Sequence, residues 1–415
     1  MATPLEKIQA AKSASNSLGL ANTQTKNAVL QNIADLLPQR APQIIAENAK
    51  DLERSVAEGL SVGLQDRLRL DVKRIQSLAD AVALVIGLPD PVGDVVRGKT
   101  LPNGVRLTEV RVPFGVIGAI YEARPNVTID IAALAIKSGN AVVLRGGSAA
   151  ENTNAVLVAL LQDALGLAGV DRNAVQTVDE FGRAGANAMM QALGLIDVLV
   201  PRGGAGLIHS VVNESKVPVI QTGDGVVHLF LDESARVDWA VDIAVNSKTQ
   251  RPSVCNALET LLVHEKAVPR VLPAVMAALR DKGVTVHGDP SIVAEYDFAV
   301  PATEDDWKAE YYTLDLAVKV VADLDEALAH IAQYSTKHTE SIITESATNA
   351  DRFLAEVDAA VVMVNASTRF TDGGEFGFGA EVGISTQKLH ARGPMGLPEL
   401  TSTKWLVRGA GQVRA

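Results

Sequence analysis

Apolar residues before residue 90 recur with the spacing of helices. One apolar stripe consists of Val29, Ile33, Leu36 and Leu37, which lie at i, i+4, i+7 and i+8. Pro38 is expected to interrupt this helix, and residues 44–60 predict a second one. A third helix is predicted near Ser77–Leu88. The opening segment Thr3-Pro4-Leu5-Glu6 is typical of a capping box with proline at the first helical position.

From residue 116 onward, short apolar runs alternate with helical stretches. The predicted strands are Val116–Tyr121, Ala141–Arg145, Gln176–Val178, Asp197–Val200 and Val217–Ile220, then Val226–Leu231, Leu258–Val263, Ala317–Val321 and Ser341–Thr344. The predicted helices are Thr128–Lys137, Asn152–Leu165, Asp238–Asn246 and Leu324–Ala332. Strands that alternate with helices predict an α/β fold, with parallel sheets covered by helices on both faces.

Three segments depart from this alternation. Residues 105–112 alternate only partly between apolar and polar, which predicts extended chain exposed on one side. The tail Leu397–Ala415 has little helical period and is expected to form an extended arm. The glycine-rich stretch Asn365–Gly383 predicts a long loop, and long ordered loops in compact domains are often functional.

Composition narrows the possible classes of protein. Hydrophobic residues make up 47% of the 415 residues and charged residues 21%, so the chain can bury a large core and is not globally disordered. The length suggests two or three domains. With 38 basic and 49 acidic residues the net charge is −11, so no basic face for nucleic acid is expected and local arginine clusters become informative. No apolar run has the roughly 18 residues that a membrane helix needs.

Cys255 is the only cysteine, and it lies in the polar segment Lys248–Asn256, just before an apolar run. It cannot form an intrachain disulfide, so it is either an inert core thiol or a nucleophile. Lys248 and Arg251 favour the nucleophile, because cationic neighbours lower a thiol pKa. A single cysteine and an N-terminus unlike a signal peptide predict a cytoplasmic protein.

Four loop segments are rich in glycine and polar residues: Glu122–Asn126, Arg145–Ser148, Pro201–Gly206 and Arg369–Gly374. Three of them follow predicted strands, where open α/β sheets bind ligands and where helix N-termini offer N–H groups to anions. Each could equally be an ordinary turn. No histidine pairs with Cys255 at zinc spacing, so no metal site is expected. The phosphate-loop motif and the G-x-G-x-x-G fingerprint are both absent.

Several segments together resemble the γ-glutamyl phosphate reductase family, a proline-biosynthesis branch of the aldehyde dehydrogenase superfamily. They are Val112–Gly147, Ile220–Gly225, Lys248–Thr260 and Val364–Met395. The resemblance implies an aldehyde-dehydrogenase-like fold with a nucleotide-binding domain (1–99 and 112–225), a catalytic domain (226–390) and a small β arm for oligomerisation (100–111 and 396–415). It also implies a homo-oligomer and a functional association with glutamate 5-kinase.

The implied reaction is NADPH-dependent reduction of L-glutamyl 5-phosphate to L-glutamate 5-semialdehyde and phosphate, the second step of proline biosynthesis from glutamate. Cys255 would be the nucleophile that forms a thioester, and Asn126 would donate to the oxyanion, although Asn126 could also be a turn residue. Two other readings stay open. One is an acylating aldehyde dehydrogenase that acts on a CoA thioester, and the other is a catalytically silent binding protein.

The resemblance also implies ligand contacts. The cofactor-binding candidates are Arg145, Gly146, Gly147, Ser148, Arg202, Gly203, Gly204 and Glu310. Arg145 suits the 2′-phosphate of NADP, because a guanidinium binds phosphate with two parallel hydrogen bonds. Glu310 is similar to a glutamate that binds the nicotinamide ribose, although Tyr311 and Tyr312 depart from the usual context. The substrate-binding candidates are Arg124 and Arg251 for phosphate, and Arg369 and Asp372 for the amino-acid end. Each arginine could instead form a structural ion pair.

One departure bears on the reaction. Hydrolytic members of the superfamily carry a water-activating glutamate where this chain has Gln221-Thr222-Gly223-Asp224-Gly225, which contains no glutamate. A thioester that is resolved by hydride or by phosphate needs no activated water. The departure therefore favours the phosphorylating reaction over oxidation to an acid.

Overall fold

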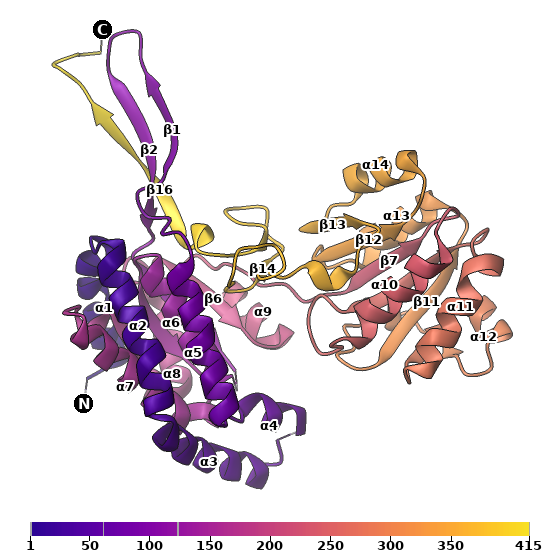
Figure 1. Ribbon diagram of the computed structural model, residues 1–415, viewed down its shortest axis with the longest axis horizontal. Helices are drawn as coiled ribbons and strands as arrows, with labels where there is room; N and C mark the ends of the chain where they lie inside the picture. Colours follow the sequence, from indigo (N-terminus) through magenta and orange to yellow (C-terminus); the bar gives the residue numbers. More distant parts are fainter. Residues whose placement is uncertain (1, 61, 123, 415) are drawn as a thin grey trace. The chain divides into compact units, whose positions relative to one another are not determined.

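The chain divides into two compact units (Figure 1). The computed structural model describes residues 2–60, 62–122 and 124–414, so Ala123 of the predicted loop Glu122–Asn126 lies outside the described residues. The first unit comprises Met1–Thr222, Gly377–Gly383 and Met395–Ala415, and the second comprises Gly223–Phe376 and Ile384–Pro394. Each unit has its own parallel sheet, and this arrangement confirms the predicted α/β class.

The first unit is built on a four-stranded parallel sheet of order β5-β4-β3-β6. Its strands are β3 (Val116–Tyr121), β4 (Ala141–Arg145), β5 (Val175–Thr177) and β6 (Val198–Arg202), and its crossover helices are α6 (Pro125–Lys137), α7 (Glu151–Leu167) and α8 (Gly182–Gln191), with α9 (Ala205–Glu214) after β6. All six residues of β3 are buried. The chain leaves β3 toward β4 on one side and later returns to β6 on the other. The carboxyl end of β3 is therefore a topological switch point, where such sheets bind ligands.

Five helices precede this sheet: α1 (Pro4–Gly19), α2 (Thr23–Gln39), α3 (Ala41–Ala57), α4 (Val62–Leu68) and α5 (Val72–Gly87). The predicted capping box is confirmed, because the Thr3 side chain accepts from the Glu6 amide and the Glu6 carboxylate accepts from the Thr3 amide. Pro38 lies inside the last turn of α2, so the helix ends just after it rather than being interrupted there. The third predicted helix, α5, begins at Val72, where Asp71 caps it, rather than near Ser77.

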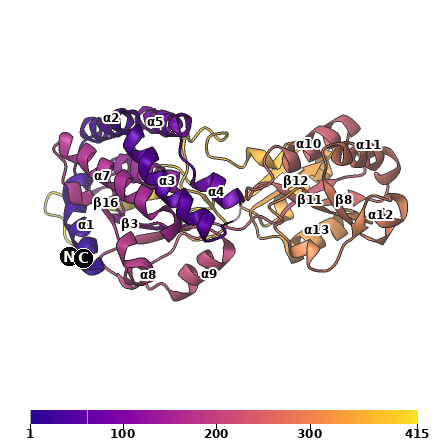
Figure 2. The ribbon, with the colours of Figure 1, turned by 90° about the horizontal axis from the view of Figure 1, so that it is seen from below.

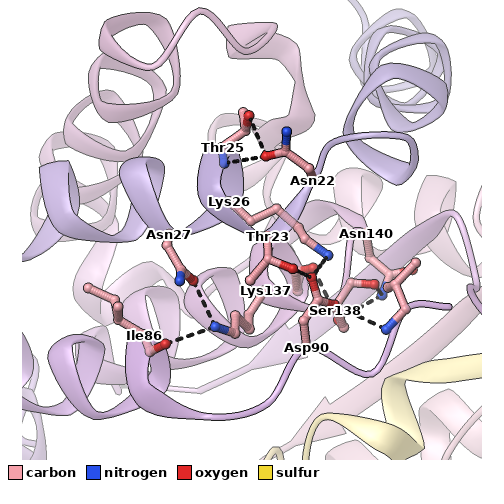
Figure 3. A network of polar contacts seen from close by, with 12 residues as sticks. Asn22, Thr23, Thr25, Lys26, Asn27, Ile86, Asp90, Lys137, Ser138 and Asn140 are labelled. Atoms are coloured by element: carbon pink, nitrogen blue, oxygen red, sulfur yellow. Dashed lines mark hydrogen bonds and ion pairs between the residues drawn. The ribbon is translucent and has the colours of Figure 1, made fainter. Parts of the chain in front are cut away.

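A buried polar network joins α2, the turn after α5, and α6 (Figure 3). Lys26 and Lys137 are each 1% exposed. The Lys26 Nζ lies 2.5 Å from Asp90 Oδ2. The Lys137 Nζ donates to Asn27 Oδ1 at 2.7 Å and to the Ile86 carbonyl at 2.9 Å. Two buried lysines thus depend on one carboxylate and two neutral acceptors, which ties these three segments together.

The second unit is built on a seven-stranded parallel sheet of order β10-β9-β11-β8-β7-β12-β13. Its strands are β7 (Val227–Leu231), β8 (Leu258–His264), β9 (Thr285–Gly288), β10 (Val300–Pro301), β11 (Asp315–Val321), β12 (Thr339–Ile343) and β13 (Val361–Val364). Its helices are α10 (Val237–Thr249), α11 (Val268–Asp281), α12 (Pro290–Glu295), α13 (Leu324–Tyr334) and α14 (Ala347–Glu356).

Helices cover both faces of this second sheet. Helices α10 and α11 lie on one face and α13 on the other (Figure 2). Leu261 and Val263 of β8 pack in the cluster that contains α10 and α11, whereas Leu262 between them packs in the cluster that contains α13. Because successive side chains of a strand point to opposite faces, the apolar side chains of one strand can serve both clusters. Polar side chains also lie in these strands, and all of them are buried: His228 in β7, and Glu259, Thr260 and His264 in β8.

A separate antiparallel ribbon belongs to the first unit (Figure 1). It consists of β1 (Val95–Thr100), β2 (Arg106–Pro113) and β16 (Thr401–Arg408), and β16 pairs with β2 along its whole length. The extended chain predicted for residues 105–112 and for the tail is confirmed by β2 and β16. The first strand of the ribbon begins at Val95, earlier than residue 100, where the arm was expected to begin. Trp405 and Val407 of β16 are 47% and 62% exposed. A small two-stranded sheet of β14 (Ile384–Ser385) and β15 (Gly393–Pro394) lies in the second unit.

Every predicted strand except one is confirmed to within two residues, whereas the ends of the predicted helices differ from the structure by up to five residues. Val217–Ile220 is not a strand, since only an isolated bridge joins Val219 to Leu199. Pro218 lacks the N–H that a continued ladder needs. Helix α6 begins at Pro125 rather than at Thr128, because proline is well suited to the first helical position.

The Asp90 network generates a stability prediction. Asp90→Asn leaves the buried Lys26 ammonium without its counter-charge, so the free energy of unfolding at pH 7 should fall by about 3–5 kcal/mol. Urea denaturation followed by circular dichroism measures this loss. Asp94→Asn, an exposed change in the same turn, is the matched control and should leave the midpoint unchanged.

The pH dependence of this loss follows from the Asp90 carboxyl. Burial raises its pKa, but hydrogen bonds from Lys26 and Thr23 outweigh burial and leave the pKa below its usual value. The contribution is therefore complete above the unfolded pKa of about 4 and is lost as the pH falls through the native value. A stability gap between wild type and Asp90→Asn that stayed constant down to pH 2 would contradict this assignment.

Candidate active site

Cys255 lies on the loop between helix α10 and strand β8, and it is partly exposed. Hydrogen bonds fix the backbone around it. The Ala257 amide donates to the Val254 carbonyl at 3.0 Å, and the Asn256 side chain donates to the Thr371 carbonyl at 2.9 Å. The Thr368 hydroxyl donates to the Asn256 carbonyl at 2.7 Å. The thiol is therefore held on an ordered loop and not within the apolar core.

Gly225 sets how closely a second loop approaches Cys255. A Cβ atom at Gly225 would lie 1.6 Å from the Cys255 carbonyl oxygen. Any side chain there would displace the backbone of the cysteine loop. Residues 221–225 stood out in the sequence for their family resemblance and for their lack of a glutamate, but the steric role of Gly225 was missed.

Arg369 and Asp372 lie in a small polar cavity of about 250 Å³ in the second unit. Its lining residues are Asn246, Gln250, Arg369, Phe370, Asp372 and Glu375. The Arg369 Nε donates to Gln250 Oε1 at 2.8 Å. Burial lowers the pKa of the Arg369 guanidinium, while Asp372 and Cys255 both raise it, so Arg369 lies within electrostatic range of both groups. Sequence reasoning missed Asn246, Gln250 and Glu375, which carry no motif of their own.

The other substrate candidate of this unit, Arg251, is exposed and acts electrostatically on Arg369, whose pKa it lowers. The structure thus gathers Cys255, Arg251, Arg369 and Asp372 in one region of the second unit. A thiol beside two guanidinium groups suits an anionic substrate.

Glu310 is connected to the region of Cys255 by its hydrogen bond with Tyr312. The Tyr312 hydroxyl donates to Glu310 Oε2 at 2.5 Å, whereas Glu310 Oε1 is buried and accepts no hydrogen bond. Burial raises the pKa of Glu310. Burial, Glu310, Asp224 and Cys255 all raise the pKa of Tyr312, which places Tyr312 within electrostatic range of the thiol. An unpartnered buried carboxylate oxygen can accept a ligand hydroxyl.

Tyr312 has a φ of 59°, a left-handed conformation that is rare for an aromatic residue. Such backbone conformations cost about 1–3 kcal/mol and persist where surrounding structure imposes them. The departures from family context noted in the sequence, Tyr311 and Tyr312, therefore form a constrained turn beside Glu310.

A larger cavity, of about 700 Å³, opens in the first unit at the switch point of the sheet. Its lining residues are Ile120, Glu122, Arg145, Gly147, Ser148, Ala149, Arg183, Ala186, Asn187, Met190, Leu207, Ser210, Val211 and Glu214. They follow β3 and β4 and continue along α8 and α9. Three predicted cofactor residues (Arg145, Gly147 and Ser148) are among them. Arg183, which sequence reasoning missed, adds a second guanidinium.

Gly146 belongs to the packing beneath this cavity. Its amide donates to Asp179 Oδ1 at 2.7 Å, and a Cβ atom there would lie 2.0 Å from Asn154 Nδ2. Burial raises the pKa of Asp179 to about 6. Gly146 therefore allows the loop after β4 to approach α7 closely.

The predicted cofactor residues Arg202, Gly203 and Gly204 lie at the end of β6 and directly after it, and they are not among the residues that line this cavity. The Gly204 amide, at the start of α9, donates to Glu122 Oε2 at 3.2 Å. A Cβ atom at Gly203 would lie 2.8 Å from the same oxygen. These glycines therefore allow Glu122 to approach the N-terminus of α9, where its charge is stabilised.

Asn126 and Arg124 lie at the N-terminus of α6, also in the first unit. The Asn126 side-chain nitrogen donates to Asp130 Oδ2 at 3.1 Å, which fixes the amide on its own helix. Burial raises the pKa of Asp130 to about 6, against the opposing effects of Asn126 and Arg202. Arg124 precedes the helix, and its carbonyl accepts from the Val127 amide at 3.0 Å.

Two further statements concern metal ions and membranes, and both apply to the part of the chain that the structure describes. No group of three or more His, Cys, Asp or Glu side chains there is placed to hold a metal ion. Among the described helices, none combines the length and the apolar character needed to cross a membrane.

Comparisons with known proteins identify the family of this chain. Residues 5–294 match the aldehyde dehydrogenase family. The chain is 65% identical over 414 residues to the gamma-glutamyl phosphate reductase of Clavibacter michiganensis subsp. michiganensis, covering 100% of this chain and 96% of that protein. It is 57% identical to the enzyme of the same name from Thermobifida fusca, with 97% of each chain covered.

Solved structures show the same relationship. The crystal structure of gamma-glutamyl phosphate reductase from Thermotoga maritima is 47% identical, covers 99% of this chain and 100% of that one, and has a TM-score of 0.97. An acetylating aldehyde dehydrogenase from Geobacillus thermoglucosidasius has a TM-score of 0.72 at 18% identity, which shows a shared fold alone. The chain therefore belongs to the aldehyde dehydrogenase family and, within it, to the γ-glutamyl phosphate reductases.

Proposed function

We propose that this protein catalyses the NADPH-dependent reduction of L-glutamyl 5-phosphate to L-glutamate 5-semialdehyde and phosphate, the second step of proline biosynthesis from glutamate. The observation that carries the proposal is the position of Cys255, on an ordered loop within electrostatic range of Arg369, in a chain that belongs to the γ-glutamyl phosphate reductases. A thiol in that position can form a thioester with an anionic acyl phosphate.

Cys255 acts as the nucleophile. Its thiolate attacks the acyl carbonyl, the bond from that carbon to the phosphate oxygen breaks, and inorganic phosphate leaves. A free thiol with a pKa of about 8.5 is only a few per cent ionised at pH 7, so ionisation contributes at most a few tens-fold. Most of the acceleration must come from positioning and from stabilisation of the oxyanion. The hydrogen bonds that fix residues 254–257 provide the positioning.

Asn126 donates to the oxyanion, and Asp130 orients it. Removing one donor of this kind typically costs about 10²–10³ in rate. The hydrogen bond to Asp130 Oδ2 at 3.1 Å holds the amide in one orientation. A pre-oriented donor needs no rearrangement when the negative charge develops.

The proposed cofactor is NADPH, and each unit by itself offers residues with suitable chemistry. The cavity of about 700 Å³ has a usual size for such a ligand, and its two guanidinium groups, Arg145 and Arg183, suit phosphate groups. Gly147 and Ser148 contribute to the same wall. Glu310 offers a buried, unpartnered oxygen to a ribose hydroxyl. Bound there, the cofactor supplies hydride to the thioester carbon.

The substrate's remaining groups are bound by polar residues around Cys255. Arg369 binds the α-carboxylate, and Asp372 binds the ammonium group, within the cavity of about 250 Å³. Arg124 and Arg251 bind the phosphate. Residues 221–225 contain no glutamate to activate water, so the thioester is preserved for reduction. Collapse of the hemithioacetal then releases the aldehyde and restores the thiolate.

The units carry separate roles in this proposal. The first unit binds the nucleotide, and the second carries the nucleophile. The ribbon of β1, β2 and β16 mediates homo-oligomerisation, because its outer strand β16 exposes Trp405, Leu406 and Val407 along an unpaired edge. The enzyme works in the cytoplasm, in functional association with glutamate 5-kinase, which makes its unstable substrate.

The reverse reaction tests the function directly. Glutamate semialdehyde and NADP⁺ should yield NADPH, followed by its absorbance, only when inorganic phosphate is added. Phosphate is needed because it is the group that releases the acyl chain from Cys255. Turnover without phosphate would indicate that water resolves the thioester and would replace this function by simple aldehyde oxidation. Turnover that needs coenzyme A instead would indicate an acylating dehydrogenase.

The nucleophile has its own test. Cys255→Ser should abolish detectable turnover, since a serine hydroxyl is hardly ionised at neutral pH. NADPH affinity, measured by fluorescence titration, should stay within about twofold because the cofactor contacts lie on other residues. An equal loss of turnover and of cofactor affinity, with altered circular dichroism, would indicate misfolding and would contradict the assignment of Cys255 as the nucleophile.

Arg145 provides a test of cofactor choice. Arg145→Gln removes one charged hydrogen-bond partner of the 2′-phosphate, so the KM for NADPH should rise about 10–100-fold. The KM for NADH, which lacks that phosphate, should change little. Arg183→Gln, on the same cavity, is the matched comparison. An equal rise in the KM for NADPH and for NADH would contradict a role for Arg145 in binding the 2′-phosphate.

A further inference from the structure

A buried ion pair closes the base of the loop that carries Cys255. Lys248 lies at the end of α10 and Glu259 near the start of β8, and their side chains are 0% and 1% exposed. The Lys248 Nζ lies 2.6 Å from Glu259 Oε2. The segment between them contains both Arg251 and Cys255. The pair therefore joins the two ends of this loop.

The same pair touches the turn that carries Glu310. The Lys248 Nζ lies 5.6 Å from the centre of the Tyr311 ring, in a cation–π arrangement. The Tyr311 backbone amide faces the Glu259 carboxylate and stabilises its ionised form. Lys248 and Glu310 also interact electrostatically. One buried pair thus contacts two separate segments of the second unit.

A second path connects these segments on the other side of Cys255. The Gly225 amide faces the Glu310 carboxylate, and the Gly225 Cα packs against the Cys255 carbonyl. The cysteine loop and the Glu310–Tyr312 turn are therefore linked twice, once through Gly225 and once through the ion pair. A shift of either segment must disturb one of the two links.

A contribution to folding stability does not by itself explain why this buried ion pair is present. Burial raises the pKa of Glu259 to about 8 and lowers that of Lys248, so burial opposes both charges. Glu259 Oε1 is buried and accepts no hydrogen bond. Well-packed apolar residues often replace buried ion pairs without loss of stability, whereas a charged pair specifies one geometry.

We infer that Lys248 and Glu259 are positioning residues, which hold the Cys255 loop in a fixed relation to the Glu310–Tyr312 turn. The inference rests on the proposed function for the roles of Cys255 and Glu310. Removing the pair should leave the fold intact and allow the nucleophile to shift. A displacement of about 1 Å at a reacting group can cost on the order of 10²-fold in rate.

The test compares three variants with wild type in the full-length protein. The double variant Lys248→Met/Glu259→Leu removes both charges, whereas Lys248→Met alone leaves a buried carboxylate without its partner. Lys266→Met removes the exposed pair Lys266–Glu233, whose atoms lie 3.0 Å apart, and is the matched control. Because Cys255 is the only cysteine, its alkylation by iodoacetamide reports on the site with no background from other thiols.

The double variant should keep the urea midpoint of wild type while its alkylation rate changes about tenfold or more, with a displaced pH profile. Its kcat should fall by a larger factor than its KM for the substrate changes. The single variant should lose stability, and the control should match wild type in every measurement. A stable double variant with the wild-type alkylation profile and kcat would overturn the inference.

A fourth variant covers the case in which the double variant does not fold. Glu259→Gln keeps the shape of the side chain but removes its charge, so the ion pair with Lys248 is lost and the alkylation profile should again be displaced. An unchanged profile would again overturn the inference. Alkylation needs neither substrate nor cofactor, so the result of this test does not depend on whether the proposed function is correct. A failed reverse reaction together with a displaced alkylation profile would overturn the function and leave the positioning role in place.

Discussion

The close packing of Gly225 against the Cys255 carbonyl is the constraint on which the rest of the second unit's site depends. At this contact a single carbon atom would already collide with the backbone, so only glycine can stand there. The contact fixes the cysteine loop against the segment before β7, while Thr368 and Thr371 hold it from the other side. If Cys255 acts as the proposed nucleophile, a thiol held from two sides needs little rearrangement to react, and positioning of this kind can lower a barrier more than ionisation can.

Each unit of this acidic protein places arginine side chains at a cavity. Arg145 is the last residue of β4, Arg183 lies in the first turn of α8, and Arg369 lies in the segment after β13. Arg145 and Arg183 line one cavity, and Arg369 lines the other. Local clusters of this kind create binding sites that a net charge of −11 would not suggest.

Buried lysines serve two different purposes in the two units. Lys26 and Lys137 bind a carboxylate and neutral acceptors, and they join helices to a turn (Figure 3). Lys248 instead closes the loop that carries Cys255, the proposed nucleophile. The desolvation cost is similar in kind in both places, so the difference lies in what each lysine holds in position.

The sequence by itself determined the α/β class, the strands that are buried on both faces, and the lone cysteine in a polar loop. Those features are local, because a continuous apolar run such as β3 needs no partner to be recognised. Only the tertiary structure decided that Gly225 touches Cys255, that Arg183 joins Arg145, and that Lys248 meets Glu259. Such contacts depend on sheet order and on the direction of each side chain. Neither the sheet order nor the direction of a side chain can be read from the periodicity of a sequence. The segment around Val219 shows the same limit, because its apolar residues predicted a strand and the structure forms only an isolated bridge there.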